Sequence, residues 1–189
     1  MGRRRWGRKV LKTGVLYEVE IDRLVLLLQD GREFSFPETL SNGRASYVLF
    51  ESLVRELTGL AKTTGSDHID DQGRTYEQKA YTDHELFPHG KDLFQCSASS
   101  TFAANNRGPV INRLLEDGDY ESALEICRET GYSKNDFYIF SNTRDYRPDV
   151  PFRFIVMTSE SVVSMLDTTD PRMISRCAVL STVKETIRL

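Results

Sequence analysis

The sequence predicts an α/β protein in which a central mixed β-sheet is flanked by helices. Short apolar segments rich in strand-forming residues occur in both halves of the chain, and two longer segments have apolar residues at helical spacing. Of 189 residues, 39% are hydrophobic and 28% are charged, as in an ordinary globular domain. A chain of this length can bury a core without disulfides, so we expect one domain over residues 1–189.

The first 60 residues are predicted to combine strands with a helix. Residues 15–22 (VLYEVEID) and 23–36 (RLVLLLQDGREFSF) are expected to form short strands, with Asp30-Gly31 as a turn signal. Residues 46–61 are predicted to form an amphipathic helix, because their apolar residues recur every three or four positions. These residues are Val48, Leu49, Leu53, Leu57 and Leu60.

The rest of the chain predicts a hairpin, a second helix and further strands. We expect a β-hairpin around Gly73 and a loop over residues 84–108. Residues 111–129 have helical spacing, and Asp117-Gly118-Asp119 is a candidate break in that helix. The remaining predictions are strands over 136–142 (DFYIFSN) and 151–159 (PFRFIVMTS), then a short helix after residue 161 and a strand near 177–183.

The charge of the chain is unevenly distributed. Residues 1–14 carry six basic side chains and no acid, so this arm has a charge of +6 and the remainder −9, given a total of −3. A basic arm of this kind can contact the phosphates of a nucleic acid, or it can be a solubilising tail. The acidic remainder is compatible with a DNA enzyme, because a metal site concentrates carboxylates and the metal cancels part of their charge.

Cysteine content and hydropathy argue against several other classes of protein. The three cysteines are widely spaced and form no CxxC pair, which disfavours a disulfide framework or a thiolate zinc site and favours a reducing cytosol. The longest apolar run, residues 24–28, is far shorter than the roughly 20 residues that span a membrane. The basic start of the chain lacks the apolar stretch of a secretion signal.

The segment from 65 to 81, GSDHIDDQGRTYEQKAY, carries the strongest chemical signal. Side chains alternate along a strand, so Glu77 and Lys79 share one face while Gln78 lies on the other. With a three-residue turn ending at Gly73, Asp67 falls opposite Glu77, and directly opposed residues on one face are about 5 Å apart. We therefore expect two carboxylates and one ammonium to lie together on the surface of a sheet.

Two carboxylates so close need a compensating charge, and a divalent cation supplies it. Mg²⁺ prefers hard oxygen ligands and typically takes one or two protein carboxylates while keeping several waters. Such a metal polarises a phosphodiester and acidifies a bound water. A neighbouring lysine can orient that water and stabilise the charge that develops on phosphorus.

In these residues the sequence resembles the PD-(D/E)xK superfamily of nucleases, in particular the small type II restriction endonucleases of the PvuII kind. Asp67 corresponds to the first acid and Glu77-Gln78-Lys79 to the ExK element, although Ser66 stands where a proline often precedes the aspartate. The resemblance covers residues 65–81 closely and implies a restriction-endonuclease-like core, with 15–60 as N-terminal strands and helix and 61–189 as the catalytic core.

The resemblance also implies site residues, a cofactor and partners. Asp67, Glu77 and the main-chain carbonyl of Gln78 would bind Mg²⁺, and Lys79 would be the catalytic lysine. The substrate would be a specific sequence in double-stranded DNA, cut by a homodimer whose two-fold symmetry matches a palindromic site. Asp70 and Asp71 could supply a further ligand, but aspartates also collect in turns for backbone reasons, and we favour the turn role for both.

Residues 94–107 are a candidate DNA-reading segment. They are rich in small hydroxyl and amide side chains, which can hydrogen-bond to base edges. The candidate contacts are Ser99, Thr101, Asn105, Asn106 and Arg107. An ordinary polar loop that precedes the next helix would have the same composition, and both interpretations stay open.

Other interpretations of this sequence compete with the nuclease. His68, His84 and His89 lack the spacing of a zinc site and are expected to be surface or DNA-contacting residues. A repair or recombination nuclease of the same superfamily would act on DNA structure in place of sequence. A non-catalytic binding module, with the 65–81 segment as a solvated hairpin, is the alternative from a different class.

Overall fold

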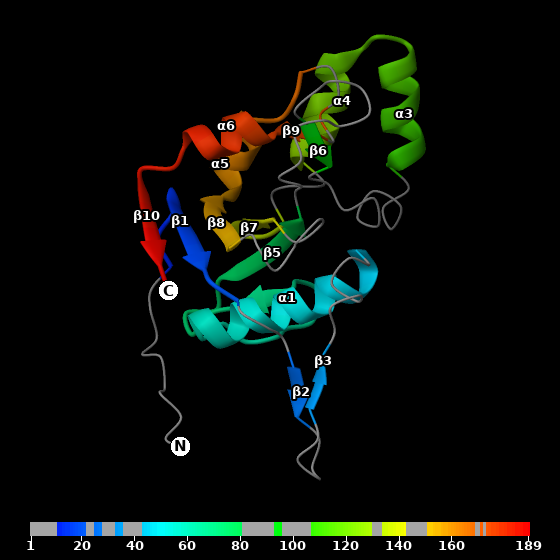
Figure 1. Cartoon of the computed structure of the whole chain (residues 1–189). Helices are drawn as coiled ribbons and strands as arrows, with labels where there is room; N and C mark the ends of the chain where they lie inside the picture. Colours follow the sequence, from blue (N-terminus) through cyan, green and yellow to red (C-terminus); the bar gives the residue numbers. More distant parts are fainter. Residues whose placement is uncertain are drawn as a thin grey trace.

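A mixed β-sheet forms the centre of this protein in a computed structural model (Figure 1). In the described part of the chain it has six strands, in the order β10-β1-β8-β7-β5-β4, together with five helices. This arrangement confirms the predicted α/β class with a central mixed sheet. The structure describes residues 11–21, 25–27, 33–35, 43–80, 93–95, 107–129, 134–142, 151–168, 171 and 173–189.

The middle of the sheet is antiparallel and its two flanks add parallel pairs. Strand β8 (Phe152–Thr158) lies antiparallel to both β1 (Val15–Val19) and β7 (Phe137–Ser141). Strand β5 (Thr75–Ala80) runs parallel to β7, and β10 (Glu185–Arg188) runs parallel to β1. The predicted strands over 136–142 and 151–159 are thus confirmed as the central pair β7 and β8.

Both faces of the sheet are covered, which explains why its central strands are apolar at nearly every position. Helix α1 (Gly43–Thr58) packs through Phe50 and Val54 on the face that includes Phe152 and Phe154. The opposite face is covered by the other helices, α3 (Gly108–Glu116), α4 (Tyr120–Cys127), α5 (Ser159–Ser164) and α6 (Arg176–Ser181). Figure 1 shows α1 on one side of the sheet and α5 and α6 on the other.

Glycines and aspartates set the ends of two predicted helices. The helix predicted over 46–61 is α1, and it ends at Thr58 because Gly59 adopts a left-handed φ of 79°. The helix predicted over 111–129 is divided into α3 and α4 around Gly118, with a φ of 76°. The carboxylate of Asp119 caps α4 by accepting a hydrogen bond from the amide of Ser122. The candidate break is therefore confirmed.

Two short antiparallel ladders lie outside the main sheet. Strand β2 (Val25–Leu27) pairs with β3 (Glu33–Ser35), in agreement with a turn at Asp30-Gly31, which itself lies outside the described residues. Strand β6 (Leu93–Gln95) pairs with β9 (Met173–Ser175). The prediction of a loop throughout 84–108 is therefore wrong at β6, because its partner strand is about 80 residues away in the sequence and leaves no local signal.

The C-terminal prediction also needs a correction. The segment 177–183, expected to be a strand, is helical as far as Ser181, and strands lie on either side of it. Its consecutive apolar residues do not distinguish a helix from a strand; the helix places Val179 in the core. No helix in the described ranges is long and apolar enough to cross a membrane.

Candidate active site

The site begins with the β4–β5 hairpin, whose predicted register is confirmed. In β4 (His68–Ile69), His68 pairs with Tyr76 and Ile69 with Thr75. The amide of Asp70 donates to the carbonyl of Arg74 over 3.0 Å, and Gly73 closes the turn with a φ of 79°. The paired residues end at His68, so the expected pairing of Asp67 with Glu77 lies beyond this ladder and stays a prediction.

Asp70 stabilises the turn, as we predicted for it. Its Oδ1 accepts hydrogen bonds from the amides of Gln72 and Arg74, each at 2.9 Å. Its Oδ2 accepts from Arg74 Nε at 2.7 Å and from the hydroxyl of Tyr76 at 3.0 Å. Burial raises the pKa of Asp70, but these hydrogen bonds outweigh it and the pKa lies below its usual value. Four donors leave this carboxylate poorly suited to bind a metal as well.

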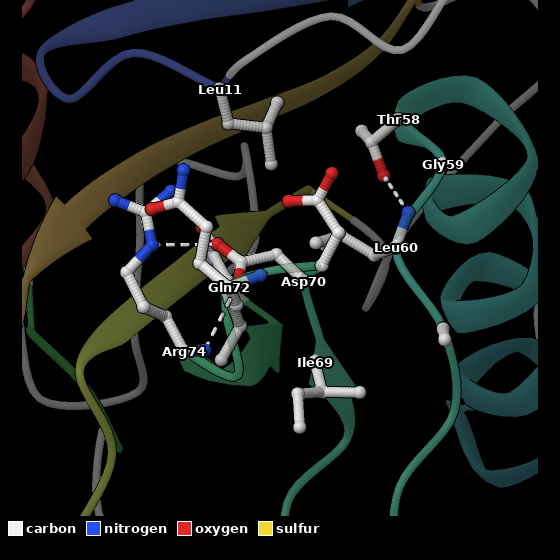
Figure 2. A pocket seen from close by; sticks show the side chains of 11 residues that line it. Leu11, Thr58, Gly59, Leu60, Ile69, Asp70, Gln72 and Arg74 are labelled. Carbon is white, nitrogen blue, oxygen red and sulfur yellow. Dashed lines mark hydrogen bonds and ion pairs between the residues drawn. The ribbon is translucent and has the colours of Figure 1, made fainter.

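A cavity of about 210 Å³ lies between this turn and the end of α1. Figure 2 shows Thr58, Gly59 and Leu60 on its α1 side, with Asp70 and Arg74 facing them from the hairpin. Leu11, Ala61, Ile69, Asp71, Gln72 and Tyr76 complete the lining. Neither Glu77 nor Lys79 contributes to it, so this cavity is separate from the predicted catalytic residues.

Glu77 and Lys79 lie on the same face of β5, as the strand alternation predicted. Lys79 Nζ is 2.5 Å from Glu77 Oε1, and the two side chains are 13% and 19% exposed. In the parallel ladder with β7, Glu77 pairs with Tyr138 and Lys79 with Phe140, which belong to the core face covered by α3 to α6. The pair is thus partly shielded from solvent while remaining accessible at the edge of that core.

Asp67 is hydrogen-bonded to Gln78, the residue between Glu77 and Lys79. Its Oδ2 accepts a hydrogen bond of 2.8 Å from the main-chain amide of Gln78. The preceding residue, Ser66, donates its hydroxyl to Asn135 Oδ1 at 2.6 Å and so ties this end of β4 to the segment before β7. The structure therefore brings the carboxylate of Asp67 to the strand that carries Glu77 and Lys79.

Helix α1 contributes two charged residues that the sequence prediction did not include. Glu51 and Arg55 form an i,i+4 ion pair with 3.6 Å between Arg55 Nη1 and Glu51 Oε2. Burial raises the pKa of Glu51, and the nearby negative charge of Asp67 raises it further. The sequence does show a Glu-x-x-x-Arg spacing beside the buried Phe50 and Val54. No local pattern, however, indicates that this pair lies near Asp67.

The other face of β5 holds a buried polar cluster. His68, Gln78 and Ser141 are all fully buried. His68 Nε2 lies 2.9 Å from Gln78 Oε1, and Gln78 Nε2 donates to Ser141 Oγ at 3.3 Å. Burial lowers the pKa of His68 to about 4, so the ring is neutral at pH 7. The expectation that His68 is a surface or DNA-contacting residue is therefore wrong, because α1 and the sheet enclose it.

Most of the candidate DNA-reading residues lie outside the described part of the chain. This is the case for Ser99, Thr101, Asn105 and Asn106, and also for His84 and His89. Arg107 is described; it is exposed and occupies the N-terminal end of α3. An exposed guanidinium at that position can reach a phosphate or a base edge.

The possible metal ligands at this site are of the type that Mg²⁺ prefers. Asp67 and Glu77 contribute carboxylates and Gln78 a main-chain carbonyl, which are hard oxygen ligands. Among the described residues, no group of three or more His, Cys, Asp or Glu side chains is arranged to hold a metal ion. Two carboxylates, a carbonyl and waters would complete the coordination of Mg²⁺. A zinc site built from side chains alone would need more side-chain ligands.

Comparison of this chain with protein-family models, with curated proteins and with solved structures yields no significant match.

Proposed function

We propose that this protein is a Mg²⁺-dependent type II restriction endonuclease with a restriction-endonuclease-like core, which hydrolyses phosphodiester bonds at a specific double-stranded DNA sequence. The observation that carries the proposal is the β4–β5 hairpin, where Asp67 Oδ2 accepts a hydrogen bond from the Gln78 amide at 2.8 Å and Lys79 Nζ lies 2.5 Å from Glu77 Oε1. Two acids and one amine on one hairpin are the groups that metal-assisted phosphodiester hydrolysis uses.

Each residue has a distinct role in this proposal. Asp67, Glu77 and the carbonyl of Gln78 would hold the cation, which when bound polarises the scissile phosphate and acidifies a water. Lys79, whose amine is largely shielded from solvent, would donate hydrogen bonds to the attacking water and to the phosphate oxygens. Glu77 holds the Lys79 amine in place before substrate binds.

The surroundings of the site support the same function. The charged groups lie on a rigid strand inside a mixed sheet, which holds them more firmly than a loop would. Arg107 and the basic arm over residues 1–14 supply positive charge for phosphate contacts. Since one subunit with one such site cuts one strand, we propose a homodimer with two-fold symmetry for a palindromic target.

Digestion of DNA tests the proposal directly. Purified protein is incubated with plasmid and genomic DNA, with Mg²⁺ or with EDTA, and the ends are sequenced. We expect discrete fragments that share one sequence at their ends, and only with Mg²⁺. A smear, or cuts confined to branched DNA, would indicate instead a repair or recombination nuclease of the same superfamily.

An Asp67→Asn variant connects the activity to the proposed site. Replacing the acid should lower the cleavage rate by at least about 100-fold, as expected for the loss of a group that stabilises the transition state. Asp71→Asn is the matched control, because Asp71 is an exposed acid in the turn of the same hairpin. If Asp67→Asn cleaves DNA as fast as wild type, Asp67 is not part of the active site; if wild type binds DNA without cutting it, the protein is a non-catalytic module.

A further inference from the structure

We propose that His68 is a positioning residue for this site, and that it acts through a directional chain of hydrogen bonds from Arg55 to Ser141. The chain crosses α1, β4, β5 and β7 beneath the strand that carries Glu77 and Lys79. The inference rests on the proposed nuclease function, because the geometry that it maintains is that of the proposed catalytic groups.

The direction of the chain follows from its donors. A guanidinium can only donate, so at the contact of 3.4 Å between Arg55 Nη1 and His68 Nδ1 the ring nitrogen is the acceptor. A neutral imidazole then carries its proton on Nε2, which donates to Gln78 Oε1 at 2.9 Å. The Gln78 amide group consequently faces Ser141 Oγ, 3.3 Å away. With this tautomer of His68 and this orientation of the Gln78 side-chain amide, each hydrogen bond in the chain has one donor and one acceptor.

The first member of the chain is itself held in place. Arg55 Nη2 donates to Ser52 Oγ at 2.9 Å and its Nη1 pairs with Glu51, so helix α1 fixes the guanidinium before it meets His68. At the other end, Ser141 belongs to β7, whose ladder with β5 pairs Gln78 with Ile139. Loss of the imidazole would leave polar groups unpaired in the core, which native proteins avoid.

Gln78 connects this chain to the proposed catalytic residues. Its main-chain amide is bound by Asp67 and its side chain by His68, so two consecutive residues of the hairpin hold the same glutamine from two directions. Glu77 and Lys79 flank it in the sequence and point to the opposite face of β5. A rotation of the Gln78 backbone would therefore displace both catalytic side chains and the carbonyl between them.

Three substitutions of His68 separate positioning from simple stability. His68→Gln can keep a donor near the position of Nε2, His68→Asn can keep a group only near Nδ1, and His68→Phe keeps neither. We expect kcat to fall about tenfold to 100-fold in the Asn and Phe variants with KM for DNA changed less than about threefold, since small displacements of catalytic groups have effects of this size. His68→Gln should recover most of kcat.

Ile111→Val is the matched control, because Ile111 is fully buried in the core cluster on the side of the sheet away from His68. It should lower thermal stability while leaving kcat unchanged. Circular dichroism and thermal unfolding define a temperature at which all variants are folded, and the kinetics are measured there. If folded His68→Phe has the kcat of wild type, or if Ile111→Val loses as much kcat as His68→Phe, the positioning role is rejected.

NMR of the wild-type protein tests the chain without any nuclease assay. The ¹⁵N shifts of the imidazole should show a protonated Nε2 and an unprotonated Nδ1, and the Gln78 amide protons should exchange slowly. The opposite tautomer would overturn the chain. If the tautomer is as inferred but no DNA is cut, the nuclease proposal fails while the hydrogen-bond chain stands, so the two failures are distinguishable.

Discussion

The two faces of β5 differ in the polar groups that they carry, although residues of the two faces alternate along the same six-residue strand. The face toward α1 carries Gln78, which is fully buried and hydrogen-bonded to the neutral ring of His68. The face toward α3 to α6 carries Glu77 and Lys79, which are charged and partly exposed. Neutral groups can be buried when every donor and acceptor is paired, whereas charges are far more costly to bury. Under the proposed function, the buried groups toward α1 contribute stability, and the charged groups on the other face carry out the chemistry.

Lys79→Met should produce the largest difference between the faces. The substitution keeps an unbranched side chain but removes the amine, so the proposed stabilisation of the transition state is lost and cleavage should fall by about 100- to 1,000-fold. DNA binding should change little, because it depends on many phosphate contacts. Cleavage assays and filter binding measure the two effects. A retained rate would show that the charged face is not catalytic.

The stability of the protein should depend on pH through His68. Its pKa is about 4 in the folded protein and about 6.5 when unfolded, so between these values only the unfolded chain binds the proton. The free energy of unfolding should therefore decrease as pH falls from about 6.5 to 4, by up to about 3 kcal/mol. Urea unfolding at several pH values measures it, and His68→Phe, which cannot titrate, should lack this decrease.

Gln78→Leu should lower the free energy of unfolding by about 1–3 kcal/mol, because it leaves His68 and Ser141 without their buried partner. The apolar side chain is similar in size, so little of the loss comes from packing. Chemical unfolding gives the value. Gln72→Leu is the control, since Gln72 is exposed in the turn of the same hairpin; an equal loss in both variants would contradict the role of the buried chain.

Gly73→Ala should have the smallest effect, a loss of about 1–2 kcal/mol. Gly73 has a φ of 79°, and a left-handed conformation costs an ordinary residue about that much. Nothing lies within 4 Å of the added methyl group, so no steric clash contributes. Thermal unfolding checks the value, and Gly73→Asn should be milder because asparagine tolerates this region. A neutral Gly73→Ala would mean that the turn can change its conformation.

Local rules explain why much of the hairpin could be predicted from residues 65–81. Gly73 and the hydrogen bonds of Asp70 define a short turn, and the turn determines which residue of β4 lies opposite which residue of β5. Strand alternation then places Glu77 and Lys79 on one face. The central strands β7 and β8 were also predictable, because their apolar runs are long and bounded by turn residues.

Contacts between distant residues account for the features that were missed. Strand β6 exists through its partner β9, and α6 lies where a run of apolar residues is compatible with either structure. The proximity of Glu51 to Asp67 depends on how α1 lies across the sheet. In each case the deciding interaction joins elements that the sequence separates, so no local pattern contains it.

By itself, then, the sequence determined the hairpin, its register and the pairing of one amine with one acid on one face of a strand, because these follow from turn chemistry and from the two-residue repeat of a β-strand. Only the tertiary structure decided that His68 is enclosed and that Gln78 bridges it to Ser141, 63 residues further along the chain. Whether a residue is buried depends on the elements that pack against it. The same histidine in the same hairpin would be a surface residue without α1 above it.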